Sequence, residues 1–214
     1  MKTKPLVVTI PLLAIMTSAC LVSDTTHTLY LSPDGSVVWR VVEADVRSNE
    51  HCADKREAEE RTFLADVAAE AHPMATALLT LRPDGVWTEW LRRERPYTVA
   101  TEGRFDAVDR LARELLMNLG LRGESVLERN GDERTLRVTV DLREPEREGD
   151  ERILPLAGEI EDLRRYRIVL TDGRFTAATG FEIVDEDVAV PLVVDREKVL
   201  GEGGELVIAL TWRR

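Results

Sequence analysis

The chain has few cysteines and few aromatic residues for its length of 214 residues, and fewer positive than negative charges. Its two cysteines, Cys20 and Cys52, are too few for a disulfide-dense scaffold or for a zinc site built from four thiolates. Lysine and arginine number 29 against 40 aspartate and glutamate residues, which gives a formal net charge of −11. Because nucleic acids bind basic surfaces, this balance argues against DNA and RNA as partners. The hydrophobic fraction of 43% is enough for a folded core.

The chain has no apolar run at its start that is long enough to span a membrane. Leu6 to Met16 is a largely apolar stretch of eleven residues, interrupted by Pro11, whereas a helix that crosses ~30 Å of hydrocarbon needs about 20. Lys2 and Lys4 precede this stretch, and the small residues Thr17-Ser18-Ala19 follow it. A basic start, a short apolar core and small residues are typical of a secretory signal.

Cys20 follows these small residues directly, and with it the segment resembles a bacterial lipoprotein precursor. Ser18-Ala19-Cys20 stands where the lipobox of that family ends, and Thr17 stands where the family usually has leucine. The resemblance implies that residues 1–19 are a removable signal peptide and that Cys20 is the lipidation site, carrying diacylglycerol with palmitate-type chains. It implies membrane attachment through this anchor and covers about a tenth of the chain.

The family also implies where such a protein resides. Leu21 is not the aspartate that is associated with retention in the inner membrane, so the expected location is the outer membrane of the cell envelope. We expect residues 20–27 to be the lipidated cysteine and a short tether, which keeps the folded domain within about 20 Å of the bilayer. Two alternatives remain at this point: an uncleaved anchor helix running to Val22, and ordinary cleavage that leaves Cys20 as a free thiol.

Short turn signals separate strand-like runs along the rest of the chain. Ser32-Pro33-Asp34-Gly35, Asn130-Gly131 and Asp172-Gly173 each lie between β-rich segments, which predicts three tight hairpins. A fourth pair of strands encloses Asp185-Glu186-Asp187. Because hairpins with short turns join antiparallel strands, we expect an antiparallel sheet.

Two segments have helical periodicity. From Asp54 to Leu79, apolar residues recur at three- and four-residue steps, and Pro73 predicts a kink or break at His72. The second helix begins after Asp106 and ends at Gly120. The predicted fold is therefore a single α+β domain over residues 28–214: an antiparallel β-sheet of roughly seven to nine strands, with two helical segments packed on one face.

The sequence contains no recognisable catalytic or cofactor-binding motif. His27, His51 and His72 are not at metal-binding spacing, so we expect each to be a surface or loop residue. Cys52 is expected to be an unpaired cysteine at the approach to a helix. Asp185-Glu186-Asp187 lacks the rest of a calcium loop and favours a charged turn. We expect no catalytic residue, no cofactor and no metal ligand.

Trp90 lies three positions after Trp87 in a predicted strand, so the two side chains should lie on opposite faces. Trp39, Tyr97 and Phe105 are the other aromatic residues that could join an exposed patch with one of them. With aromatic residues at only 5% of the chain, burial in the core is the expected use of each.

An anchor joined to a body without a catalytic motif suggests a non-enzymatic protein. Our hypothesis is a membrane-anchored envelope lipoprotein that acts as a non-catalytic binding or structural module, with an unidentified envelope protein or apolar ligand as partner. The alternative is a carrier that holds a lipid or another apolar ligand in a cavity between helix and sheet. A third class, an envelope hydrolase, would require histidine or carboxylate side chains from distant strands to converge in one cleft.

Overall fold

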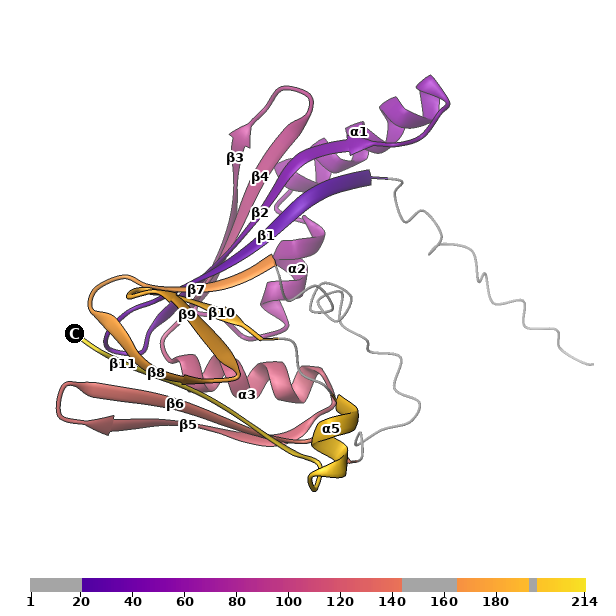
Figure 1. The fold of residues 1–214 in the computed structure, drawn as a ribbon. Helices are drawn as coiled ribbons and strands as arrows, with labels where there is room; N and C mark the ends of the chain where they lie inside the picture. The colour runs from indigo at the N-terminus through magenta and orange to yellow at the C-terminus, as the bar shows by residue number, and fades with distance from the viewer. Residues whose placement is uncertain (1–20, 144–164, 193–195) are drawn as a thin grey trace, which may run out of the picture.

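The computed structural model describes residues 21–143, 165–192 and 196–214, which form an α+β fold with two β-sheets (Figure 1). The larger sheet has the strand order β3-β4-β2-β1-β7-β10-β9. Its strands are β1 (Leu21–Leu31), β2 (Val37–Ser48), β3 (Gly85–Arg92), β4 (Tyr97–Phe105), β7 (Tyr166–Leu170), β9 (Phe181–Asp185) and β10 (Val188–Pro191). The smaller sheet has the order β5-β6-β11-β8. Its strands are β5 (Arg122–Asn130), β6 (Glu133–Asp141), β8 (Arg174–Thr179) and β11 (Glu205–Arg213).

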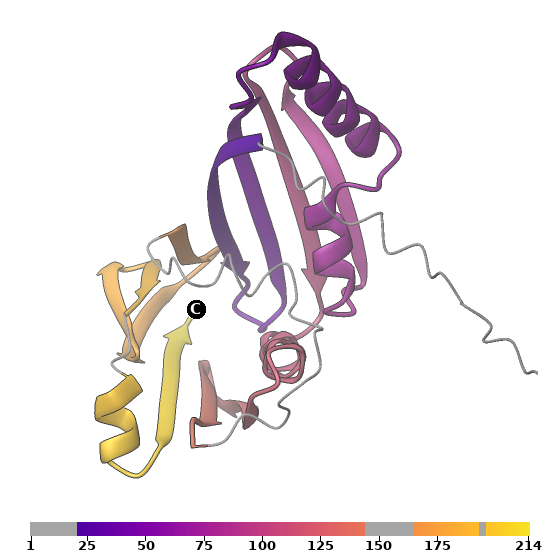
Figure 2. The same cartoon turned by 90° about the vertical axis from the view of Figure 1, so that its right-hand side faces the viewer.

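The helices lie beside both sheets rather than on one common face. Within the described ranges they are α1 (Ala53–Ala68), α2 (Pro73–Leu79), α3 (Val108–Asn118) and α5 (Arg196–Gly201). The first two cover one face of β2, β3 and β4, whereas α3 packs on β5 and β6 of the smaller sheet (Figure 2). The α+β class is confirmed, but the prediction of two helical segments on one face of one sheet was wrong.

Two of the three predicted tight hairpins are confirmed. The turn at Ser32–Gly35 joins β1 to β2, and Asn130-Gly131 joins β5 to β6. Gly35 and Gly131 have φ values of 99° and 58°, a conformation that side chains with a Cβ rarely adopt. The pairing of β9 with β10 around Asp185–Asp187 is confirmed as well.

The turn at Asp172-Gly173 does not form the third predicted hairpin. It carries the chain from β7, which pairs with β1 and β10, to β8, which pairs with β11 in the other sheet. The β1–β7 pair is parallel, so the large sheet is mixed and the prediction of an antiparallel sheet was incomplete. These two strands lie about 140 residues apart in the chain, and parallel strands are joined by a crossover connection rather than by a tight turn.

The helical run predicted over residues 54–79 is divided at the expected place. The first helix ends at Ala68, and the second begins at Pro73 after the N-cap residue His72. Proline suits the first turn of a helix because its missing N–H group has no partner there. The short helix α5 was not predicted from the sequence.

The first strand begins at Leu21, inside the segment 20–27 that the sequence suggested as a tether. Leu21 pairs with Ser48, and the pairing with β2 continues to Leu31 with one irregularity between Val22 and Asp24. Backbone hydrogen bonds to β2 therefore hold residues 21–27 in the sheet. The strand leads from the end of the sheet near α1 toward the smaller sheet (Figure 1).

A hydrophobic core joins the two sheets. Its members from the large sheet include Trp39 and Leu31, and those from the small sheet include Leu210 and Trp212. A second cluster of Val46, Phe63, Val67 and Val99 lies under α1. Because one core contacts both sheets, the described residues pack as one unit.

Candidate functional site

Of the two cysteines, Cys20 lies outside the described residues. Cys52 is an exposed free cysteine at the N-cap of α1, as expected of an unpaired residue at a helix approach, and His51 beside it is exposed as well.

His27 is a buried residue, contrary to the prediction of a surface or loop position. Its side chain is 0% exposed, and its ring stacks on Tyr166 with 4.2 Å between ring centroids. The Trp39 Nε1–H group donates to Nδ1 of this histidine over 3.3 Å. Burial, with a smaller contribution from the positive charge of Arg165, lowers the pKa of His27 to about 4. Its two-residue phase with Leu29 and Leu31 in the same strand was the signal for burial.

His72 is buried as well, with 2% of its surface exposed. Its Nδ1 accepts a hydrogen bond from the Met74 backbone N–H group at the start of α2, and its Nε2 lies 3.3 Å from a Glu43 carboxylate oxygen. Burial lowers its pKa to about 4, although the nearby negative charge of Asp66 acts in the opposite direction. Both histidines are neutral and closed to solvent at pH 7, so neither is placed to act as a general base on a substrate.

The tryptophans are divided between the two faces of β3 as predicted. Trp90 packs with Phe63 and Tyr97 under α1, whereas Trp87 lies on the face without helices. The Arg104 guanidinium lies over the Trp87 ring at 4.5 Å from its centroid. This cation–π contact covers part of the ring that could have formed an exposed aromatic patch.

The space between α2 and the large sheet is filled by side chains. Leu78 and Leu81 are fully buried there, and Gly103 of β4 lies so close to Leu78 that a Cβ atom at this glycine would be 3.5 Å from the leucine side chain. Phe63 and Val67 fill the corresponding space under α1. An apolar ligand would have to displace these side chains, so the packing argues against the carrier alternative.

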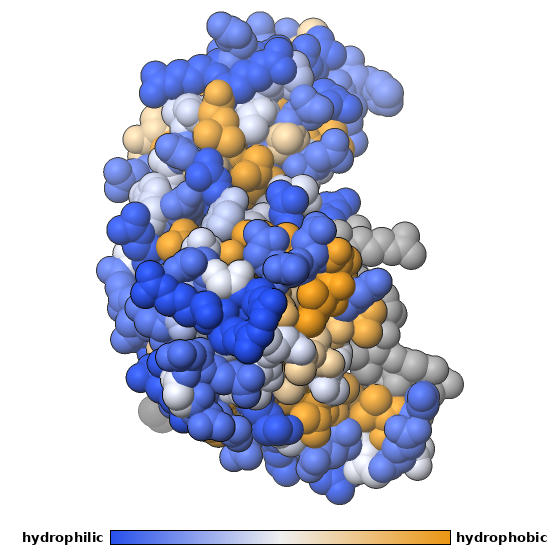
Figure 3. All heavy atoms as spheres, turned by 60° about the vertical axis from the view of Figure 1, so that its left-hand side comes forward, coloured by the Kyte–Doolittle hydropathy of each residue, from blue (hydrophilic) through white to orange (hydrophobic). Residues whose placement is uncertain are grey.

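The side of the molecule seen in Figure 3 is mainly hydrophilic, with hydrophobic side chains in separate patches.

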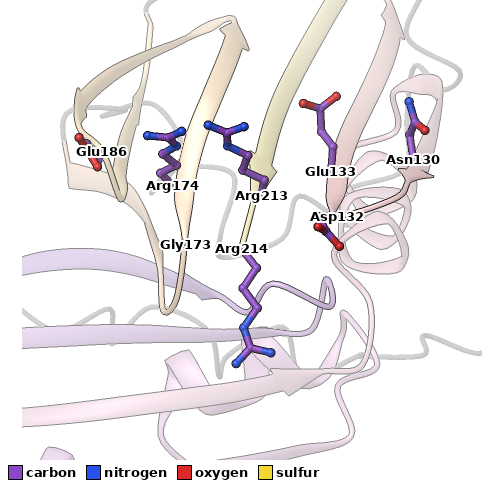
Figure 4. Close-up of a pocket in the computed structure, with 8 residues that line it drawn as sticks. All are labelled: Asn130, Asp132, Glu133, Gly173, Arg174, Glu186, Arg213 and Arg214. Carbon is purple, nitrogen blue, oxygen red and sulfur yellow. The ribbon is translucent and has the colours of Figure 1, made fainter.

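A polar depression of about 610 Å³ lies at the end of the smaller sheet, next to the Asp172-Gly173 turn (Figure 4). The depression is lined by Asn130, Asp132, Glu133, Gly173, Arg174, Glu186, Arg213 and Arg214. The sequence analysis placed Asn130, Gly173 and Glu186 in turns and predicted no site here, because the strands that carry the charged residues are distant in the chain.

The backbone register brings three charged residues of the depression into one row. Arg213 of β11 lies directly opposite Arg174 of β8 on one side and Glu133 of β6 on the other. Figure 4 shows the side chains of Arg174 and Arg213 next to each other and pointing the same way. Arg214 points away and forms an ion pair with Asp172 at 2.8 Å.

The acidic segment Asp185-Glu186-Asp187 forms the turn between β9 and β10. Its backbone is tied to neighbouring strands, because the carbonyl groups of Glu186 and Asp187 accept hydrogen bonds from Phe175 and Leu170. Over residues 21–143, 165–192 and 196–214, no three metal-ligating side chains gather closely enough to hold a metal ion. No helix in the same ranges is long and apolar enough to cross a membrane.

Comparisons with known proteins give a distant structural likeness. No protein-family model and no curated protein sequence matches the chain. The chain is similar to the folded domain of the LppM protein of Mycobacterium tuberculosis, solved by NMR, with 10% sequence identity, coverage of 89% of each chain and a TM-score of 0.35.

Proposed function

We propose that this protein is a lipid-anchored module of the bacterial cell envelope that binds a partner without catalysing a reaction. The supporting observation is the junction at residue 20. A lipobox-like segment ends at Cys20, and β1 begins at Leu21. Acyl chains on this cysteine would therefore hold the start of the sheet directly at the bilayer surface.

The anchor would set the orientation of the whole domain. An eleven-residue strand is about 35 Å long, so the Leu31 end of β1 would lie about that far from the anchored end at Leu21. We propose outer-membrane residence, as the family resemblance implies, with stable attachment through several acyl chains. The acidic surface would contribute little to attachment, because anionic headgroups repel it.

The non-catalytic part of the proposal is supported by the positions of the titratable groups. His27 and His72 are enclosed in the core, where a substrate does not reach them. The binding role is supported by the charged depression at the other end of the molecule from the proposed anchor.

Replacing the proposed acylation site tests the anchor. Cys20→Ala should abolish incorporation of labelled palmitate in the native host, because the only other cysteine follows no small-residue cleavage site. Cys52→Ala is the matched control and should keep full labelling and outer-membrane fractionation. Palmitate label on the Cys20→Ala protein, or an unacylated amino terminus found by mass spectrometry of the wild type, would contradict the proposal.

A further inference from the structure

Arg174 and Arg213 are an energetically unfavourable pair in the protein alone. They occupy directly opposite positions on neighbouring antiparallel strands, where two like charges destabilise a sheet. In the described part of the chain, neither guanidinium has a hydrogen-bond or ion-pair partner. Other arginines at the same edge do have such partners: Arg214 pairs with Asp172, and Arg134 donates to backbone carbonyl groups.

The carboxylates near the two arginines do not neutralise them. Glu133 lies opposite Arg213, and Glu186 lines the depression beside Arg174 (Figure 4). Among the described residues, neither carboxylate forms an ion pair with these arginines within 4 Å. The two guanidinium groups thus remain adjacent and available to a third group, while the flanking carboxylates disfavour a large polyanion.

We propose that Arg174 and Arg213 bind a phosphate or carboxylate group in this depression. A guanidinium group presents a planar set of N–H donors that matches both oxyanions, and two neighbouring ones can hold a single oxyanion between them. The ligand is a compact anion or one anionic group of a larger envelope component. Binding would remove the repulsion that the two arginines exert on each other in the free protein.

The proposed anion site lies far from the proposed membrane anchor. Trp212, which precedes Arg213, donates to the Pro33 carbonyl just beyond the Leu31 end of β1. The C-terminus and the start of β1 lie at opposite ends of the molecule (Figure 1). If the protein is anchored as proposed, the site is directed away from its own membrane. The anion site gives a ligand class to the proposed binding role and rests on that role for its biological meaning. Anion binding itself does not require Cys20.

Thermal unfolding at constant ionic strength tests the site. When inorganic phosphate replaces chloride and reaches ten times its Kd, the Tm of the full-length chain should rise by about 3 to 6 °C. Arg174→Gln and Arg213→Gln should each abolish most of this rise. Arg174→Gln should also raise the Tm in phosphate-free buffer by about 1 to 2 °C, because one of the two repelling charges is removed.

Arg137→Gln is the matched control. Arg137 is an exposed arginine on the same sheet, with a Glu128 oxygen 3.9 Å away, and it does not line the depression. This variant should keep the full response to phosphate. An equal response in wild type, Arg174→Gln and Arg213→Gln would overturn the proposal, as would an equal loss in Arg137→Gln, since either result indicates general charge screening.

Parallel titrations with succinate and with glycerophosphoglycerol, a soluble phosphodiester headgroup, identify the source of the anion. The compound with the lowest half-saturating concentration identifies the chemical class of the bound anion, provided that both arginine variants lose the rise in Tm that it causes. No stabilisation by any of the three compounds would overturn the site and leave the palmitate result unaffected. Loss of palmitate labelling without loss of phosphate binding would separate the site from the anchor.

Discussion

Between pH 6.5 and pH 4, the protein should lose about 3 kcal/mol of stability for each of its two buried histidines. Burial lowers the pKa of His27 and of His72 from 6.5 to about 4. In this window the unfolded chain binds protons that the folded chain does not, so acid favours unfolding. The contribution is complete above pH 6.5 and is lost as the pH falls toward 4.

Local structure adds a specific reason at each position. Protonation of His72 at Nδ1 would remove the acceptor for the Met74 backbone N–H group, and protonation of His27 at Nδ1 would remove the acceptor for Trp39. Acid therefore breaks the cap of α2 and a buried hydrogen bond, in addition to placing charges in the core.

Urea unfolding at several pH values measures this effect. The pH slope of the free energy of unfolding should decrease by up to about 1.4 kcal/mol per pH unit in His72→Asn, a variant whose side chain can still cap the helix. His51→Asn is the control, because His51 is exposed, and it should retain the wild-type slope. Identical slopes in all three proteins would show that carboxylates alone cause acid unfolding.

Trp212→Ala should lower the free energy of unfolding by about 3 to 5 kcal/mol, the usual cost of truncating a large buried aromatic side chain. Trp212 is 0% exposed in the core that joins the two sheets, and its Nε1–H group donates to the Pro33 carbonyl over 3.3 Å. The variant therefore leaves a cavity and an acceptor without its donor at the junction between the sheets.

Trp87→Ala is the matched control for this experiment. Trp87 is only partly buried on the face without helices, where it contacts Arg104. Its loss should cost about 1 kcal/mol, the magnitude of an exposed cation–π contact with a little apolar area. Equal losses in the two variants, measured by chemical denaturation, would show that the core does not join the sheets as described.

The features predicted from sequence were those that depend on neighbouring residues. Asn130-Gly131 was assigned to a hairpin because its backbone geometry suits the turn, and Pro73 was assigned to the start of a helix because it lacks an N–H group. The α+β class followed from the same local signals. The lipid anchor at Cys20 remains a prediction from the order of charge, apolar and small residues.

The structure changed those predictions that depend on distant partners. The segment around Asp172-Gly173 has the composition of a hairpin, yet its two strands pair in different sheets, β7 with β1 and β8 with β11. His27 and His72 have the polarity of surface residues, yet both are buried because a hydrogen bond to Nδ1 reduces the cost of burying each ring.

The sequence by itself determined the acidic charge, the tight turns and the break between the first two helices, since each depends on composition or on a few consecutive residues. The tertiary structure alone decided that β1 pairs with β7, that two histidines lie in the core and that Arg174 faces Arg213. Those arrangements depend on long-range strand register, which no short stretch of sequence encodes.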